Sequence, residues 1–283
     1  MGQKSVIRSG VINVRAHPNS PEVYRKLIRQ AYKLKVANKL RGDRYAVISL
    51  LQKDLVDDKF VQGVLTTFTR IDERSDWFDL ENLEEASGEK VAQISIPENL
   101  FPNPKSFYFL FNIQTHRLHL QTWSRRDTIS VRDATKMFSR LFSNPKISSK
   151  FGDVKVTMVQ SSQSLERIFS IKRISKVTIK IERPNADVFD DGFEERIQQH
   201  LAATGSRQFE VSYTAERGGN VNVNEDIRMV SNSALANGKV DVEGQGEAGK
   251  EKRSTSDHPE IRQRKYDADD QTEAQALRDL ARD

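Results

Sequence analysis

The sequence contains no cysteine. Disulfide bonds, zinc–thiolate sites, iron–sulfur clusters and a cysteine nucleophile are therefore excluded, and the absence fits a reducing cytosol. No stretch approaches the roughly 18 uncharged apolar residues that a membrane span needs, and Met1–Gly10 holds no signal-peptide core. We therefore expect a soluble, cytoplasmic protein with no membrane partner.

Motifs that identify a reaction are also scarce. The spacing Gly244-x-Gly246-x-x-Gly249 occurs without the following helix that a nucleotide-binding loop requires. His116 and His119 are three residues apart on an expected strand turn, so they point to opposite faces and do not share a metal. The sequence favours a binding protein over an enzyme, and it predicts no catalytic residue, no metal ligand and no cofactor.

Charge is abundant, and its position is more informative than its total. The net charge is +5 over 283 residues, with 30% charged residues and an isoelectric point of 9.3. Residues 1–46 hold eleven Lys or Arg but only two acids, Glu22 and Asp43. This segment is the first basic set, and its excess of positive charge favours association with a polyanion.

A helix within the first basic set arranges several of these cations in a row. Ser20 is a good N-cap and Pro21 a good first residue for a helix that runs to about residue 34. On it Arg25, Arg29 and Lys33 stack at i, i+4 and i+8, where like charges repel by a few tenths of a kcal/mol per pair. A phosphate backbone would relieve that repulsion. The alternative is a solvated helix face that is balanced by the acidic run at residues 72–89.

Two further groups of basic residues occur later in the chain. The second basic set comprises Arg117, Arg125, Arg126, Arg132, Lys136 and Arg140. Trp123 precedes two of them and suits stacking on bases, although a tryptophan at a strand end in the core is the alternative. The third basic set comprises Lys172, Arg173, Lys176, Lys180 and Arg183. Contact between any two sets would strengthen the hypothesis of nucleic-acid binding.

We expect the binding residues mainly in the first basic set. The nucleic-acid-binding residues that we predict are Arg25, Lys26, Arg29, Lys33, Lys35, Lys39, Arg41, Arg44, Arg125 and Arg126.

Hydrophobic periodicity predicts an α+β protein with largely antiparallel sheets and interspersed helices. Residues 105–113 read as a strand buried on both faces, whereas Leu118 and Leu120 alternate with polar residues and indicate a strand with one wet face. Two subdomains are expected, an N-terminal one at 1–100 and a C-terminal one at 101–243. Residues 244–283 carry eight basic and ten acidic residues with few large apolar ones, which predicts a mostly disordered tail with one short helix at most.

A metal-dependent nuclease is an alternative function. Asp153-Val154-Lys155 fits only the second half of the arrangement sought, an acid followed by acid-x-Lys on a strand. Asp187, Asp190 and Asp191 could hold a divalent cation, or they could form a turn and a helix N-terminus that the helix dipole favours.

Several short phrases spread over nearly the whole chain resemble an uncharacterised prokaryotic and prophage family built on a domain of unknown function. The phrases are Asn13-Val14-Arg15-Ala16-His17-Pro18, Arg41-Gly42-Asp43-Arg44-Tyr45, Trp77-Phe78-Asp79, Ile96-Pro97-Glu98-Asn99-Leu100, Phe151-Gly152-Asp153-Val154, Arg183-Pro184-Asn185-Ala186-Asp187 and Ser254-Thr255 with Asp257-His258-Pro259. That family carries no established activity, so the resemblance assigns no function.

A fainter similarity, in the order of elements from Phe107 to Pro184, is to the RexA exclusion protein of lambdoid phages and the B component of the Kiwa anti-phage system. Those relatives bind DNA and act in phage exclusion, and the similarity implies the same class of function. The hypothesis is a DNA-binding protein of phage exclusion or defence that contacts phosphates. The alternatives are an inhibitor that binds a phage or host replication factor, and the nuclease; the sequence leaves a homodimer open.

Overall fold

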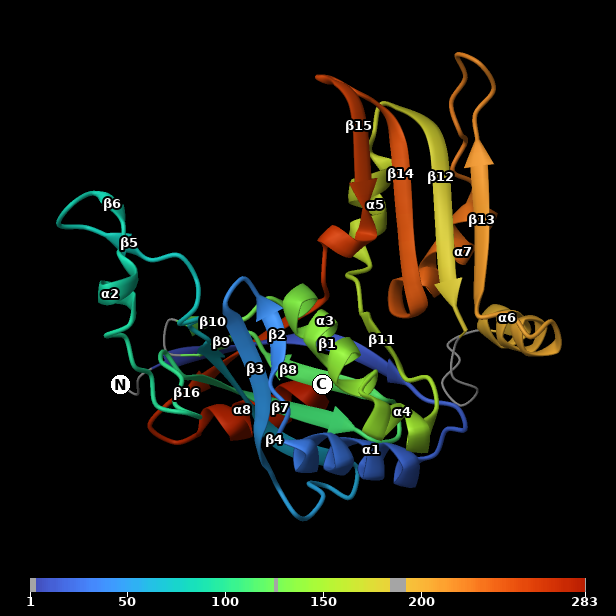
Figure 1. The fold of residues 1–283 in the computed structure, drawn as a ribbon. Helices are drawn as coiled ribbons and strands as arrows, with labels where there is room; N and C mark the ends of the chain where they lie inside the picture. The colour runs from blue at the N-terminus through green and yellow to red at the C-terminus, as the bar shows by residue number, and fades with distance from the viewer. Residues whose placement is uncertain (1–3, 125–126, 184–191, 283) are drawn as a thin grey trace.

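The larger part of the protein is an antiparallel sheet of eight strands that curls into half a barrel (Figure 1). The structure is a computed structural model that describes residues 4–124, 127–183 and 192–282. The strands of this sheet are β1 Lys4–Arg15, β2 Asn38–Arg41, β3 Arg44–Leu51, β4 Phe60–Thr69, β7 Lys105–Asn112, β8 Arg117–Gln121, β11 Lys155–Met158 and β16 Ile261–Asp267. They lie in the order β11-β1-β8-β7-β4-β3-β2, and β16 pairs with the first half of β1.

Three helices cover the inner face of this sheet. They are α1 Pro21–Leu34, α3 Val131–Phe142 and α4 Pro145–Phe151. The main core lies beneath them, where the fully buried Phe109 of β7 meets Phe138 of α3 edge to face at 6.4 Å. Since α3 contacts both β2 and β11, it fills the gap between the two ends of the curled sheet (Figure 1).

Within the segment at residues 244–283, residues 261–282 add the strand β16 to the same sheet and cover its outer face with a helix. Helix α8, Glu273–Arg282, packs Leu277 and Leu280 against Ile7, Phe60 and Leu110. The prediction of a mostly disordered tail is therefore wrong. A strand such as β16 is held by backbone hydrogen bonds, and α8 needs only three buried apolar residues, so neither requires many large side chains.

The wet face predicted for β8 is wrong for the same reason. His119 and Gln121 are 5% and 0% exposed because α8 packs on this face of β8 and its neighbouring strands. The prediction for β7 is confirmed: Phe107, Phe109 and Phe111 lie in the inner core, and Leu110 lies in the outer cluster.

A second antiparallel sheet of four strands stands beside the first (Figure 1). Its strands are β12 Arg173–Glu182, β13 Gln208–Thr214, β14 Gly238–Gly246 and β15 Gly249–Ser254, in the order β13-β12-β14-β15. One face packs on α5 Gln163–Phe169, α6 Gly192–Ala203 and α7 Glu225–Asn237 around a core of its own. The two antiparallel sheets with their helices confirm the α+β class.

The remaining elements are short. They are β5 Phe78–Asp79, β6 Glu84–Glu85, α2 Gly88–Val91, β9 Trp123–Ser124, β10 Asp127–Thr128 and the 3-10 turn η1 Thr255–Asp257. The boundary between subdomains that the sequence predicts at residue 100 falls inside the larger sheet. Strands β7 and β8 follow that residue and pair with β4 and β1, which precede it. No helix in the described ranges combines the length and the apolar character that a membrane crossing requires.

Arg15 joins the two sheets. It is 1% exposed, and its Nη1 donates to the carbonyl oxygens of Glu182 and Arg183, each at 3.2 Å. The neighbouring Asn13 donates from Nδ2 to Oδ1 of Asn237 at 3.0 Å. Burial lowers the pKa of the Arg15 guanidinium to about 10, against the opposing effect of Glu182. The guanidinium remains charged at neutral pH, so the end of β12 is held against β1.

Candidate nucleic-acid interface

The exposed side of α3 carries a row of positive charge. Ser130 caps the helix by accepting a hydrogen bond from the amide of Asp133. Arg132, Lys136 and Arg140 then follow at intervals of four residues and are exposed, while the opposite side of the helix is buried in the core. The row therefore lies at the opening between the two ends of the curled sheet.

Strand β2 adds two cations to this row. Arg140 donates from Nη1 to the carbonyl oxygen of Lys39 at 2.5 Å. Arg41 lines the same hollow of 650 Å³ as Arg132 and Lys136. The first and second basic sets thus meet at one surface, which we name the α3–β2 strip and define as Lys39, Arg41, Arg132, Lys136 and Arg140.

Two acids lie close to the α3–β2 strip. Asp133 and Asp257 line the hollow with it, and Arg132 pairs from Nη2 with Oδ1 of Asp257 at 2.5 Å. Both side chains of this pair are about half exposed, so the pair contributes little to stability and exchanges readily with other partners. Within the described residues, none of the other four cations of the strip forms an ion pair.

The cations of helix α1 are less available to a ligand than the sequence suggests. Arg29 donates from Nη2 to the carbonyl oxygen of Lys53 at 2.6 Å and so holds the connection between β3 and β4. Lys26 pairs with Glu22 at 3.6 Å, and Arg25 is only partly exposed. Lys33 is exposed. The predicted row on α1 is therefore partly used in holding the fold.

The rest of the predicted binding residues divide into three groups. Lys35 ends α1 in a left-handed conformation and is exposed. Arg44 donates from Nη2 to the hydroxyl of Thr67 at 2.8 Å, which ties β3 to β4. Arg125 and Arg126 lie outside the described residues. Trp123 is a partly exposed residue of β9.

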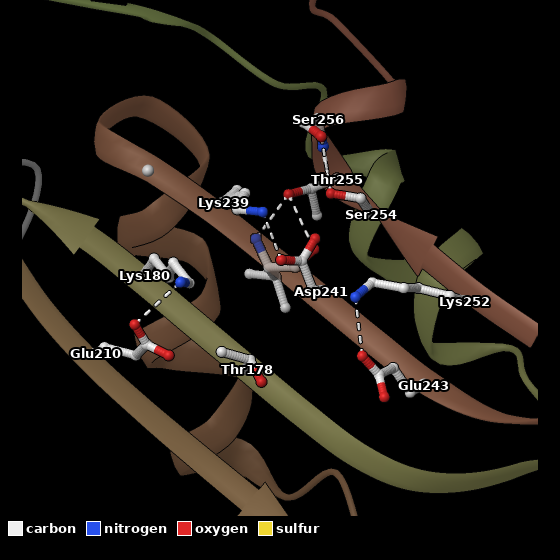
Figure 2. A network of polar contacts seen from close by, with 12 residues as sticks. Thr178, Lys180, Glu210, Lys239, Asp241, Glu243, Lys252, Ser254, Thr255 and Ser256 are labelled. Carbon is white, nitrogen blue, oxygen red and sulfur yellow. Dashed lines mark hydrogen bonds and ion pairs between the residues drawn. The ribbon is translucent and has the colours of Figure 1, made fainter.

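The third basic set lies on a different surface. Arg173, Lys176 and Lys180 of this set lie on β12 in the four-stranded sheet, whose open face alternates positive and negative groups (Figure 2). Lys180 pairs with Glu210 at 3.0 Å, and the neighbouring strands repeat the pattern with Lys239 and Asp241 at 2.6 Å. Such a face is balanced in charge, in contrast to the α3–β2 strip.

The acidic run does not lie where it could balance the first basic set. Residues 72–89 form the excursion with β5, β6 and the start of α2, which Figure 1 shows well away from α1 and α3. Lys90 from the same excursion contacts Asp79 and lies 3.9 Å from Glu81. These acids therefore form contacts within the excursion, and they do not neutralise the cations of α1 and α3.

Among the residues that the structure describes, no metal site assembles for the nuclease alternative. Asp153 is exposed and pairs with Lys155 at 2.8 Å. Across the described ranges, no three His, Asp or Glu side chains gather in a way that could hold a metal ion. Asp187, Asp190 and Asp191 lie outside those ranges.

The sequence analysis included the cations of α3 in the second basic set, but it expected the binding residues mainly in the first basic set. The spacing of Arg132, Lys136 and Arg140 after the Ser130 cap was the available clue. What the sequence could not provide is the neighbour, because β2 and α3 are separated by about ninety residues.

The fold and this surface define an α+β protein of two antiparallel sheets, with a positively charged strip on the helical covering of the larger sheet. The chain belongs to the family described as Domain of unknown function (DUF4747), whose model matches residues 6–282. The resemblance found in the sequence is thereby confirmed. No curated protein and no solved structure matches the chain.

Proposed function

We propose that the protein binds nucleic acid, and duplex DNA in particular, through the α3–β2 strip. The observation that supports this most is the meeting of two basic sets from distant parts of the sequence on one exposed surface. Cations that repel one another on a free protein gain a common partner in a phosphate backbone, and the counterions they displace add to the binding free energy.

The geometry suits contact with phosphates rather than with bases. Successive cations on α3 are about 6 Å apart along the helix axis. Lys39 and Arg41 widen the row on the side of β2. The strip contains no aromatic side chain that could stack on an unpaired base, so we expect little preference for sequence or for single strands.

The helical surroundings extend the positive surface. Residues 21–44 contain eight Lys or Arg and two acids, and residues 131–151 contain five Lys or Arg and one acid. The exposed Lys146 and Lys150 of α4 belong to this layer. They would steer DNA toward the strip without making close contacts.

The test uses two cations of the strip that form no ion pair in the described structure. We expect Lys39→Glu combined with Lys136→Glu to weaken binding to a short DNA duplex by about tenfold or more, measured by fluorescence anisotropy at low salt. The matched control is Lys172→Glu with Lys250→Glu, which changes the net charge equally on the four-stranded sheet.

The control should weaken binding far less than the strip variant. Equal loss in both variants would show that net charge alone matters and would contradict the proposed surface. Absence of binding by the wild-type protein at low salt would refute the proposal altogether. Circular dichroism on both variants verifies that the fold is retained.

A further inference from the structure

The four-stranded sheet has two edges of different character. Strand β15 forms one edge and carries Lys250 and Lys252, the kind of residues that discourage pairing with another strand. Strand β13 forms the other edge, with the sequence Gln-Phe-Glu-Val-Ser-Tyr-Thr, which has neither lysine nor proline. Its pairing with β12 runs from Gln208 to Thr214 without a bulge. In the part of the chain that the structure describes, the edge at β13 therefore lacks the protection that the lysines give to the edge at β15.

The backbone of β13 offers hydrogen bonds to a further strand. The amide of Ala215 donates to the carbonyl of Ser175, and the carbonyl of Arg207 accepts from Arg183, so odd-numbered residues bond toward β12. In an antiparallel strand the orientation alternates, so Gln208, Glu210, Ser212 and Thr214 direct their amides and carbonyls to the open side. No strand of the described chain occupies that side.

The side chains of β13 complement a second copy of the same strand. When two copies run antiparallel with Val211 opposite Val211, all seven residues pair. Phe209 then lies opposite Tyr213, and Glu210 lies opposite Ser212. Aromatic and β-branched cross-strand pairs of this kind stabilise a sheet, and no like charges meet. A shift of two residues in one direction would place Glu210 opposite Glu210, and a shift in the other direction would pair fewer residues of the strand.

We propose that the protein forms a two-fold dimer by pairing β13 with β13 of a second copy, with Val211 at the axis. The two four-stranded sheets would then become one continuous sheet. Phe209, Val211 and Tyr213 are each only partly buried against the core of this sheet, and the partner strand would cover them further. The contact is self-complementary, as a closed two-fold interface requires.

The first experiment tests the pairing register, and the absence of native cysteine makes it clean. Residues opposite each other in a non-hydrogen-bonded antiparallel pair have Cα atoms about 4.5 Å apart, which a disulfide bridges. We expect Val211→Cys to form an intermolecular disulfide under mild oxidation. The matched control, Ser212→Cys, faces Glu210 of the other copy and should cross-link at least about tenfold more slowly. Equal rates for the two variants would overturn the proposal.

The second experiment removes one hydrogen bond donor from the open edge. Ser212→Pro deletes an amide that points away from β12, so pairing within the chain is unaffected. We expect light scattering to report a dimer for the wild type and for Ser212→Ala, and a monomer for Ser212→Pro. A monomeric wild type, or a dimer that survives Ser212→Pro, would contradict the inference.

Discussion

The two faces of the eight-stranded sheet are covered in different ways. The inner face meets α1, α3 and α4 over a continuous apolar core that includes Phe107, Phe109 and Phe111. The outer face meets α8 over a small apolar cluster, and beside that cluster it buries polar groups such as Gln121 and His119. One covering depends on apolar area, and the other depends largely on specific hydrogen bonds.

The two coverings also differ in charge. The inner covering carries the α3–β2 strip and the cations of α1 and α4. The outer covering, which is α8 with the turn that leads into it at residues 267–282, holds five acids and two arginines, and Arg282 pairs with Asp57 at 2.5 Å. The two helical coverings therefore differ in charge, and the inner one suits a polyanion.

The largest effect on stability should come from the inner core. Phe109→Ala should lower the free energy of unfolding by about 3–5 kcal/mol, because Phe109 is fully buried and its removal leaves a cavity beside Phe138. Leu277→Ala in the smaller outer cluster should cost about 2–4 kcal/mol. Urea unfolding measures both, and a greater cost for Leu277→Ala would reverse the comparison.

The next effect is a dependence on pH that belongs to the outer face. Burial, together with the nearby Arg262 and Arg117, lowers the pKa of His119 from 6.5 to about 4. Between these two pKa values the unfolded chain binds a proton at this residue and the folded chain does not. The free energy of unfolding is therefore not reduced by His119 above pH 6.5, and it falls as the pH drops toward 4. The loss amounts to ~3 kcal/mol at the lower end.

Replacement of His119 should remove this dependence. His119→Gln should flatten the profile of unfolding free energy between pH 6.5 and pH 4, measured in urea at a series of pH values. The exposed His200→Gln is the control and should leave the profile as in the wild type. An unchanged slope in His119→Gln would show that this side chain is not the titrating group.

A smaller effect should come from the hydrogen bonds between α8 and the sheet. The Oε2 atom of Glu273 accepts from Nε2 of Gln121 and from Oγ of Ser124, each at 2.9 Å. Glu273→Ala leaves these buried donors without that acceptor and should cost about 1–3 kcal/mol in urea unfolding. The control is Glu247→Ala at an exposed position, which should change the free energy of unfolding by no more than about 0.5 kcal/mol. An equally small change for Glu273→Ala would show that these hydrogen bonds do not stabilise the fold.

The sequence could predict the parts of the fold that depend on local patterns, and it could not predict those that depend on contacts between distant residues. The cap at Ser20 and the double burial of β7 are local patterns, and the structure confirms them. The pairing of β16 with β1 joins residues about 250 positions apart, and no local pattern records it. Composition therefore predicted disorder for a segment whose stability comes from distant partners.

The candidate site was likewise predictable only where local sequence patterns determine it. The positive charges of the first two basic sets were visible in the sequence. The use of Arg29 in holding Lys53 was not visible, and neither was the approach of Arg140 to Lys39. Residue type and spacing predicted a cationic surface, whereas the arrangement of strands determined which cations share it.

The most direct measurement is the salt dependence of DNA binding by the wild type and by a variant with Arg132→Gln, Lys136→Gln and Arg140→Gln. Each phosphate that a cation neutralises contributes about 0.9 to the slope of log K against log salt concentration. We expect a steep negative slope for the wild type and a slope about two to three lower in magnitude for the variant. A flat wild-type response, or equal slopes for the two proteins, would contradict binding of phosphates by the α3–β2 strip.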